Sequence, residues 1–519
     1  MEPSRRGTAR TRDLPPGPSP NRASTATLRS VLVANRGEIA LRIIRTCHDL
    51  DIRAVAVYSD VDRDALHVRA ADAAYPIGPA APRESYLNAA RLIEVAKRSG
   101  CEAIHPGYGF LSESWEFAQA VADAGLIFVG PPASVQRTLG EKTAARRLAQ
   151  SVDVPVAKGT EPLRDLAAAH EAAKAIGYPV LLKPAGGGGG KGIRTVRREG
   201  DLDAAWRGAT GEATTAFGQA ALYLEQAIIP ARHIEMQLLA DGHGNVVWLG
   251  ERDCSVQRRH QKLIEETPGP WVDERLREQL GAAAVRIAKK AGYRNAGTVE
   301  FLVDHTGRFY FLEVNTRLQV EHPVTEMVTG LDLVALQLAI AAGERLPFTQ
   351  ADVVRRGAAI ECRITAEDPA AGFLPASGVI ALVREPAGPG IRVDSALFAG
   401  MTVATEYDPL LAKVIAHGRD RVEAIARMRR ALEEMRVAGI PTSLPFHRSA
   451  LFHQLFITGR YDTSFVAQWD HRAREELSDG AVTAAALAAV LASRARSEHR
   501  LVAPVDQLWG RSAREDALR

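Results

Sequence analysis

Residues 181–196, which read LLKPAGGGGGKGIRTV, decide the fold of this chain. Two short apolar runs flank five consecutive glycines, and this pattern predicts two strands joined by a glycine-rich turn. Because glycine has no Cβ, the backbone N–H groups of Gly188, Gly189 and Gly190 are open to phosphate oxygens. The segment therefore predicts a glycine flap between two strands that closes over a nucleoside triphosphate.

Two other glycine-rich motifs fit this stretch less well. A P-loop is excluded, because Ala185 stands where that motif has glycine and Gly192 follows the lysine where Ser or Thr is required. The spacing of Gly187, Gly189 and Gly192 matches the dinucleotide fingerprint, but the residues that follow favour a strand over a helix. A flexible linker is the remaining alternative, and a linker does not usually lie between two apolar strands.

A second predicted hairpin, residues 298–315, carries acidic side chains and reads TVEFLVDHTGRFYFLEVN. If residues 304–307 form its loop, Glu300 faces residue 311. Glu313 is then a diagonal neighbour on the same face, about 7–8 Å away, and Asn315 shares that face. Such oxygen ligands suit Mg²⁺ or Mn²⁺ bound to substrate phosphates, so we expect a metal site. A solvated polar face of the sheet is the alternative.

Polar side chains continue beyond this hairpin at every second position. They are Glu313, Asn315, Arg317, Gln319 and Glu321. An extended chain points all five side chains to one side, so the pattern predicts a row of polar side chains that continues along the strand from the metal site. A solvated surface strand would show the same pattern.

Composition narrows the class of protein. The chain has 519 residues, 46% of them hydrophobic and 24% charged, with a net charge of +3. At roughly 150 residues per domain, this length predicts three to four domains. The balanced charge gives no reason to expect nucleic acid, and no apolar run approaches the roughly 20 residues that span a bilayer. The four cysteines form no C-x-x-C pair, which fits a reducing cytoplasm.

Strands alternate with helices from residue 31 to residue 129, which is typical of a parallel, doubly wound sheet. Residues 1–28 are rich in Arg and Pro and are expected to form a disordered extension, with a transit peptide as the alternative. The tail from about residue 472 is rich in Ala and Arg and helical by propensity.

The motifs of this chain resemble those of the biotin carboxylases, a group of ATP-grasp enzymes. RRHQK and NTR-x-QVEHPVTE are the most specific of them, because other ATP-grasp enzymes share the glycine flap but not that pair. The resemblance covers roughly residues 30–470, and the matching stretches are VANRGEIALRI (33–43), HPGYGFLSE (105–113), GEK (140–142), KPAGGGGGKG (183–192), ERDCSVQRRHQK (251–262), TVEFL (298–302), EVNTRLQVEHPVTE (313–326) and ECRITAEDP (361–369).

The resemblance implies a multidomain α/β and α+β fold. Its expected parts are a Rossmann-like pre-ATP-grasp domain at residues 29–141, an ATP-grasp domain at 142–348 with a glycine-rich lid at about 156–227, and a C-terminal biotin carboxylase domain at 349–470. Residues 471–519 resemble the start of the linker domain of longer acyl-CoA carboxylase α chains, as a docking segment or a remnant.

Site residues are carried over from the matching motifs. The resemblance implies a nucleotide site formed by Lys142, Lys183, the glycine flap with Gly188–Gly190, Glu225, Ile228, His233, Gln257 and His260. Glu300, Glu313 and Asn315 would hold two Mg²⁺ or Mn²⁺ ions, and Arg317, Gln319 and Val320 would hold bicarbonate. Glu321 would be the base, Lys262 would reach the phosphates, and Arg363 and Tyr108 would lie beside biotin. His105 is expected to be a structural histidine.

The reaction implied by the resemblance is the ATP-dependent carboxylation of biotin by bicarbonate through carboxyphosphate, the first half-reaction of an acyl-CoA carboxylase. No Ala-Met-Lys-Met-like hairpin is present, so we expect the biotin carboxyl carrier protein and the carboxyltransferase on other chains. A homodimer is expected from the resemblance, although the match around Glu406–Pro409 is loose. The competing hypotheses are another ATP-grasp carboxylating ligase and a non-catalytic nucleotide-binding protein of an assembly.

Overall fold

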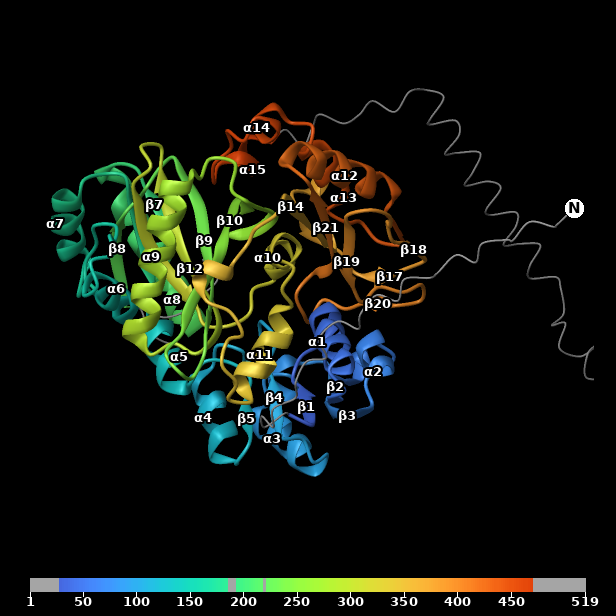
Figure 1. Ribbon diagram of the computed structural model, residues 1–519. Coiled ribbons are helices and arrows are strands. Elements are labelled where there is room, and N and C mark those ends of the chain that lie inside the picture. The colour runs from blue at the N-terminus through green and yellow to red at the C-terminus, as the bar shows by residue number, and fades with distance from the viewer. Residues whose placement is uncertain (1–27, 185–192, 218–220, 470–519) are drawn as a thin grey trace, which may run out of the picture. The chain divides into compact units, whose positions relative to one another are not determined.

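The computed structural model describes residues 28–184, 193–217 and 221–469 (Figure 1). The predicted disordered extension, the glycines of the flap and the predicted helical tail lie outside these residues.

The first part of the chain forms the predicted parallel sheet, with strand order β3-β2-β1-β4-β5. Its strands are short and apolar, and all four residues of β1 are buried, as expected for a sheet covered on both faces. The strands are β1 (Ser30–Val33), β2 (Arg53–Ser59), β3 (Ala73–Gly78), β4 (Ala103–His105) and β5 (Ile127–Phe128). The helices are α1 (Gly37–Asp49), α2 (Leu66–Ala70), α3 (Ala89–Arg98), α4 (Trp115–Asp123), α5 (Ala133–Gly140) and α6 (Lys142–Gln150).

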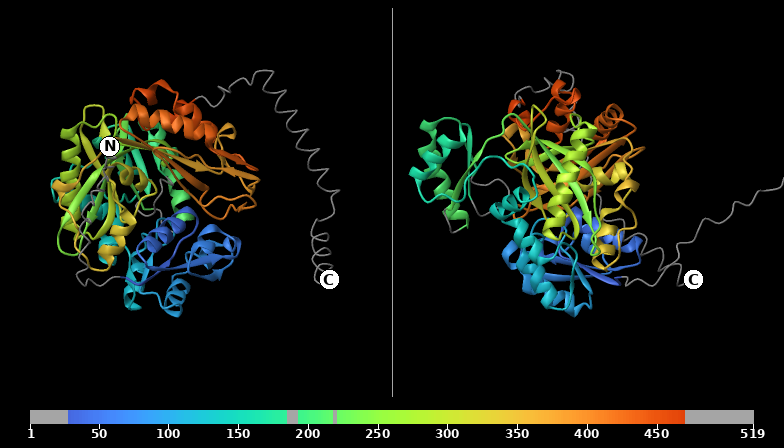
Figure 2. Two further views of the ribbon diagram at one scale, coloured as in Figure 1. Left: turned by 45° about the vertical axis from the view of Figure 1, so that its right-hand side comes forward. Right: turned by 60° about the vertical axis from the view of Figure 1, so that its left-hand side comes forward.

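A separate three-stranded sheet carries the two sides of the glycine flap. β6 (Val180–Pro184) pairs antiparallel with β7 (Arg194–Val196) and with β8 (Leu222–Gln226), in the order β7-β6-β8. The two strands predicted on either side of the glycine flap are therefore confirmed. Helices α7 (Leu166–Ile176) and α8 (Leu202–Phe217) accompany this sheet, and the right-hand view of Figure 2 presents it in teal and green.

The largest sheet has eight strands in the order β13-β12-β9-β10-β11-β14-β21-β19. Its strands are β9 (Ala231–Ala240), β10 (Val246–Arg258), β11 (Gln261–Thr267), β12 (Asn295–Asp304), β13 (Phe309–Asn315), β14 (Ala358–Thr365), β19 (Ile391–Ser395) and β21 (Leu410–Gly418). β11 pairs with β14, so the sheet crosses the boundary expected near residue 349 without a break.

Helix α9 (Glu274–Ala291) covers part of this sheet. It begins where the Asp273 carboxylate accepts from the N–H of Leu276, and it ends at Gly292 in the left-handed conformation. Leu280 and Ile287 on α9 pack in the same core as Val299 and Phe301 of β12.

The remaining helices belong to the second half of the chain. They are α10 (His322–Thr329), α11 (Leu333–Ala341), α12 (Arg421–Glu434), α13 (Leu444–Ala450), α14 (Gln454–Ile457) and α15 (Phe465–Gln468). Short strands complete the fold, namely β15 (Glu367–Asp368), β16 (Leu374–Pro375), β17 (Gly378–Val379), β18 (Leu382–Arg384), β20 (Thr402–Val403) and β22 (Arg436–Ala438). Among the described residues no single helix is long and apolar enough to cross a membrane, although α10 and α11, bent by 97°, reach that length and composition as a pair.

Candidate active site

A buried lysine lies at the centre of the site. The Lys262 ammonium on β11 donates to Glu235 at 2.5 Å, to Glu300 at 2.8 Å and to Glu321 at 2.7 Å. Burial alone lowers the pKa of Lys262, but the three carboxylates outweigh burial and hold that pKa well above its usual value. The site therefore keeps a fixed positive charge beside three acidic side chains.

The acidic hairpin forms, but its register differs from the prediction. Glu300 pairs directly with Glu313 for two reasons: Val303 pairs with Phe309, one residue later than the predicted loop allows, and a bulge between Phe301 and Glu300 adds one more residue to the opposite strand. The diagonal arrangement expected from a regular hairpin is therefore wrong, and the two carboxylates are closer neighbours than predicted. The Asn315 amide donates to Glu300 at 2.8 Å, which places the third predicted metal ligand beside them.

The charges of these carboxylates suit a cation. Burial and the neighbouring Glu300 raise the pKa of Glu313. Burial also opposes ionisation of Glu300, but Lys262 and His233 overcome it and lower the pKa of Glu300. Among the described residues the Glu313 carboxylate makes no hydrogen bond or ion pair, so a cation bound beside it would relieve the repulsion from Glu300.

The predicted row of polar side chains lies on an extended strand only as far as Asn315. β13 ends there, and residues 316–321 form a turn that leads into α10, whose early Pro323 is favourable at a helix start. The prediction of one extended strand through Glu321 is therefore wrong, because the chain must change direction to begin this helix.

The turn nevertheless brings the predicted side chains together. The Arg317 guanidinium donates to Gln319 at 2.9 Å and to Asn315 at 3.2 Å, and it lies 3.0 Å from the Glu113 carboxylate. The Gln319 amide in turn lies 3.4 Å from Glu300. A cation and an amide thus stand next to the acidic hairpin, where an anionic substrate could be held.

Glu321 lies between two cations. One of its carboxylate oxygens accepts from Lys262, and the other accepts from the Arg363 guanidinium on β14 at 2.8 Å. Burial raises the pKa of Glu321, but Lys262, Arg363 and Arg252 together hold it well below its usual value. Glu321 is therefore ionised at neutral pH, as a base must be.

A second group of basic side chains includes Lys142, Lys183 and His260. The buried Lys183 on β6 donates to Glu225 on β8 at 2.7 Å. Lys142 begins α6, and its pKa is lowered by burial and by Lys183 against the attraction of Glu313. Burial and then Lys183 also lower the pKa of His260, which sits in the turn between β10 and β11. The two ammonium groups suit phosphate, and the His260 ring can donate a hydrogen bond to it.

The other predicted nucleotide contacts are distributed around these cations. His233 on β9 lies 2.8 Å from Glu300, Gln257 on β10 pairs in register with Lys262, and Ile228 is half-buried just after β8. Gly188, Gly189 and Gly190 lie outside the described residues. His105 is buried, and its ring accepts from the N–H of Gly107, which agrees with the structural role expected for it.

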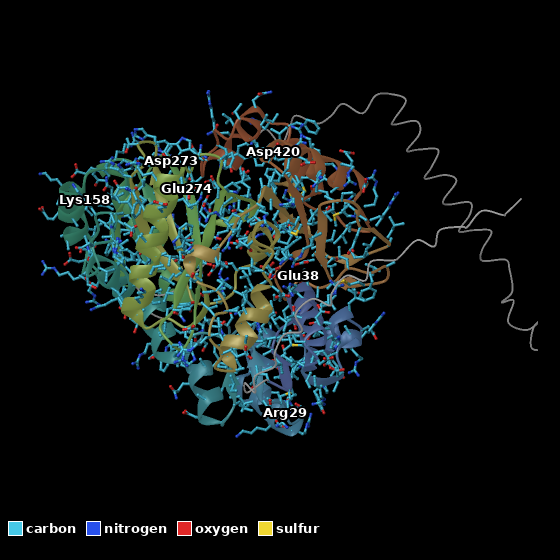
Figure 3. All side chains as sticks on the ribbon, viewed as in Figure 1. Arg29, Glu38, Lys158, Asp273, Glu274 and Asp420 are labelled. Carbon is cyan, nitrogen blue, oxygen red and sulfur yellow. The ribbon has the colours of Figure 1, made fainter. Side chains whose placement is uncertain are left out.

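Lys413 connects Tyr108 to the turn that carries Val320. The fully buried Lys413 ammonium donates to the Val320 carbonyl at 2.9 Å and lies 3.2 Å from Glu38, which is labelled in Figure 3. Glu38 accepts a hydrogen bond from the Tyr108 hydroxyl, and the Lys413 ammonium is 5.8 Å from the centre of the Tyr108 ring. The Lys413 ammonium thus contacts both the turn expected to bind bicarbonate and Glu38, the hydrogen-bond partner of Tyr108, which is expected to contact biotin.

Sequence reasoning missed four buried residues of this site: Glu235, Arg252, Glu265 and Lys413. The signal was present for two of them. Glu235 belongs to a run of alternating polar residues, His233-Ile234-Glu235-Met236-Gln237, and Lys413 interrupts the apolar run 410–416. Arg252 lies within a quoted motif, and its guanidinium donates to Glu235 at 2.5 Å and to Gln237 at 2.8 Å.

Comparison with known proteins agrees with this geometry. Three family models match: the biotin carboxylase N-terminal domain over residues 27–135, the ATP-binding domain of the carbamoyl-phosphate synthase L chain over 141–349, and the biotin carboxylase C-terminal domain over 361–468. These matches follow the order of the fold, from the parallel sheet through the flap to the far end of the large sheet.

Individual relatives match over most of this chain. Biotin carboxylase 1 of Bacillus subtilis is 49% identical over 445 residues, covering 85% of this chain and 99% of the relative. The alpha chain of mitochondrial methylcrotonoyl-CoA carboxylase from Arabidopsis thaliana is 48% identical over 471 residues, covering 90% of this chain and 64% of the relative.

A solved structure is similar in the same way. The biotin carboxylase domain dimer of Hydrogenobacter thermophilus 2-oxoglutarate carboxylase, in complex with MgADP, ADP and bicarbonate, has a TM-score of 0.83 and 45% identity, covering 85% of this chain and 97% of that one. Agreement at this level in sequence, domain order and fold shows that the chain belongs to the biotin carboxylase family of ATP-grasp ligases.

Proposed function

We propose that this chain uses ATP and bicarbonate to carboxylate biotin held on a separate carrier protein. The observation that carries the proposal is the fully buried Glu321 carboxylate, held between Lys262 and Arg363 next to the acidic hairpin. We also propose the domain boundaries expected above, with residues 29–141, 142–348 and 349–470 as the three folded parts and the lid at about 156–227.

The acidic hairpin fits divalent cations. Glu300 and Glu313 face each other across the strands with Asn315 beside them, and this all-oxygen set is the kind that Mg²⁺ and Mn²⁺ prefer. We propose these three residues as the ligands of two ions. Bound there, the ions would offset the negative charge of the ATP phosphates.

Bicarbonate is proposed to lie beside the turn that follows β13. The Arg317 guanidinium and the Gln319 amide would donate to its oxygens, together with the N–H of Val320. Glu321 would remove the bicarbonate proton, and a bicarbonate oxygen would then attack the γ-phosphorus of ATP to give carboxyphosphate and ADP. Lys262 would balance the charge that develops, because it lies 2.7 Å from the same carboxylate.

ATP is proposed to lie between the flap and the large sheet. Lys142, Lys183 and His260 would hold its phosphates, and Glu225 and the backbone near Ile228 would contact its adenine, with His233 and Gln257 lining the pocket. The basic side chains described above support this placement, because burial and the charge of Lys183 lower the pKa values of Lys142 and His260, and a bound phosphate would offset that repulsion. The glycine flap would close over the phosphates.

Biotin would react in the second step. Carboxyphosphate would break down to CO₂ and phosphate, and the phosphate would take the proton from N1 of biotin. Arg363 would stabilise the negative oxygen of the deprotonated biotin, whose N1 would then attack CO₂ to form carboxybiotin, and Tyr108 would contact its ring. Arg363 fits this role because its Nη1 has no hydrogen-bond partner among the described residues, while its Nε and Nη2 are held.

We propose that the biotin carrier and the carboxyltransferase are on other chains. We also propose that this chain forms a homodimer. The Arabidopsis relative is by name the alpha chain of a carboxylase, which supports an enzyme of several chains, and the Hydrogenobacter structure is a dimer. We place the reaction in an acyl-CoA carboxylase. Acetyl-CoA and propionyl-CoA are the acceptors to test first.

The test is ADP release by the purified chain with Mg-ATP and bicarbonate, with and without free biotin, beside Glu321→Gln. We expect bicarbonate-dependent release that rises with biotin in the wild type and falls by at least 100-fold in the variant. A wild type that binds ATP but releases no ADP, even with a biotinylated carrier protein, would point to a non-catalytic role in an assembly. A Glu321→Gln variant with full activity would exclude Glu321 as the base.

A further inference from the structure

Glu265 is a buried carboxylate that the proposed mechanism does not use. It lies on β11, is fully buried, and accepts a hydrogen bond from Nε of Arg363 at 2.5 Å. The Nη2 group of the same guanidinium donates to Glu321 at 2.8 Å. Arg363 is therefore shared between two carboxylates, of which one is the proposed base.

The strand register fixes Glu265 on one side of Arg363. β11 and β14 are neighbours inside the eight-stranded sheet, and Glu265 pairs directly with Glu361. Arg363 lies two residues beyond Glu361 on the same face, so the Glu265 contact with Arg363 is diagonal. A carboxylate on a central strand has little freedom to move away, in contrast to Glu321 on its turn.

The backbone of Arg363 is held by two residues outside the sheet. Its carbonyl accepts from the Ser443 hydroxyl at 3.0 Å and lies 2.6 Å from the His447 ring. The side chain is long, however, and an arginine has about 2 kcal/mol of rotamer entropy to lose before it takes one orientation. Two charge-assisted hydrogen bonds provide that restraint in the structure.

One of these two bonds must weaken during the proposed reaction. Glu321 cannot hold the bicarbonate proton and remain a full acceptor for Arg363 at the same time. The bond from Glu265 then remains as the restraint on the guanidinium, and it leaves Nη1 free to point at a ligand. We propose that Glu265 is a positioning residue that orients Arg363 for the biotin step. This inference rests on the proposed function.

The experiment separates the two steps at pH 8. ADP release with bicarbonate but no biotin measures the step that needs Glu321, and the increase with biotin measures the step that needs Arg363. For Glu265→Gln, which keeps the shape and removes the charge, we expect kcat/KM for biotin to fall 10- to 100-fold. ADP release without biotin should stay within about twofold of the wild type.

Glu361→Gln is the matched control. Glu361 is equally buried and lies directly opposite Glu265, but its oxygens make no hydrogen bond among the described residues. Burial raises its pKa well above the usual value and so favours its neutral form, which a glutamine imitates. Both activities of this control should stay within about twofold of the wild type.

A double mutant tests whether Glu265 acts through Arg363. We expect Arg363→Met combined with Glu265→Gln to equal Arg363→Met alone, because residues that act through one contact are not additive. Additive losses would overturn the proposal, as would equal losses in the steps with and without biotin. A wild-type chain with no bicarbonate-dependent ADP release would refute the proposed function instead.

Glu265→Asp is the second variant if the first does not fold. It keeps the charge but shortens the reach to Nε of Arg363, so kcat/KM for biotin should fall at least threefold while ADP release without biotin is unchanged. Wild-type values for both steps would show that the position of this carboxylate does not matter, and the proposal would fail.

Discussion

Replacing Lys413 by methionine removes the one charge that joins Glu38 to the Val320 carbonyl. At 3.2 Å and an effective dielectric constant of about 20, the Lys413–Glu38 attraction is about 5 kcal/mol before desolvation. Removing one partner of a buried pair costs about 3–5 kcal/mol, because the other charge is left uncompensated. We expect the free energy of unfolding of Lys413→Met to fall by about this amount at pH 8.5.

The loss should depend on pH. Burial raises the pKa of Glu38 to about 7 against the opposing attraction of Lys413, whereas the unfolded carboxyl titrates near 4.5. A raised pKa makes Glu38 favour the folded state at low pH, and that contribution is lost as the pH rises through 7. Without Lys413 the pKa of Glu38 rises further, so the loss continues to higher pH. The gap to the wild type should therefore shrink to about 1–2 kcal/mol at pH 6.

Urea unfolding at pH 6 and pH 8.5 measures both values, with the exposed Lys97→Met as the control for loss of a lysine. The KM for bicarbonate should also rise in Lys413→Met, because the Val320 carbonyl loses its donor. A pH-independent loss, or a gap that widens toward pH 6, would refute the electrostatic reasoning.

Two further changes test the packing and the metal site. Gly297→Ala should lower the free energy of unfolding by about 1–3 kcal/mol or prevent folding, because the added Cβ would lie 2.0 Å from the Tyr293 hydroxyl. Thermal melts against Gly200→Ala, which meets no atom within 4 Å, measure this loss, and equal melting temperatures would contradict it. Glu313→Gln should raise the Mg²⁺ concentration for half-maximal ADP release at least tenfold, since one of two facing carboxylates is lost. A Mn²⁺ titration of the same variant checks binding directly, and unchanged affinity would remove Glu313 from the ligand set.

Local patterns predicted the elements of this fold well. The flanks of the glycine run pair as β6 and β7, and the alternation of strands and helices in residues 31–129 forms the predicted parallel sheet. Family motifs supplied the candidate site residues, and Glu300, Glu321 and Arg363 among them meet at Lys262 or its partners.

Features that depend on more than one segment could not be predicted in the same way. The bulge beside Glu300 changes the register but leaves no mark on the alternation of the residues, and the turn after Asn315 continues an every-second-residue pattern without a strand. The partners of Lys413 lie in segments far away along the chain, so an apolar run interrupted by one lysine gives the residue but not its contacts.

The ladder between β11 and β14 bears on how the chain can be divided. Four residue pairs join these strands across the boundary near residue 349, so the two sides share a backbone hydrogen-bond network. A fragment that stops at that boundary would expose the edge of β11, and open edges promote aggregation. Split-protein reporters and domain exchanges should therefore avoid this boundary and cut in a surface turn such as 241–245, which interrupts no pairing of β11 with β14. The two parts of the chain that separate family models match therefore share one continuous sheet in the folded protein.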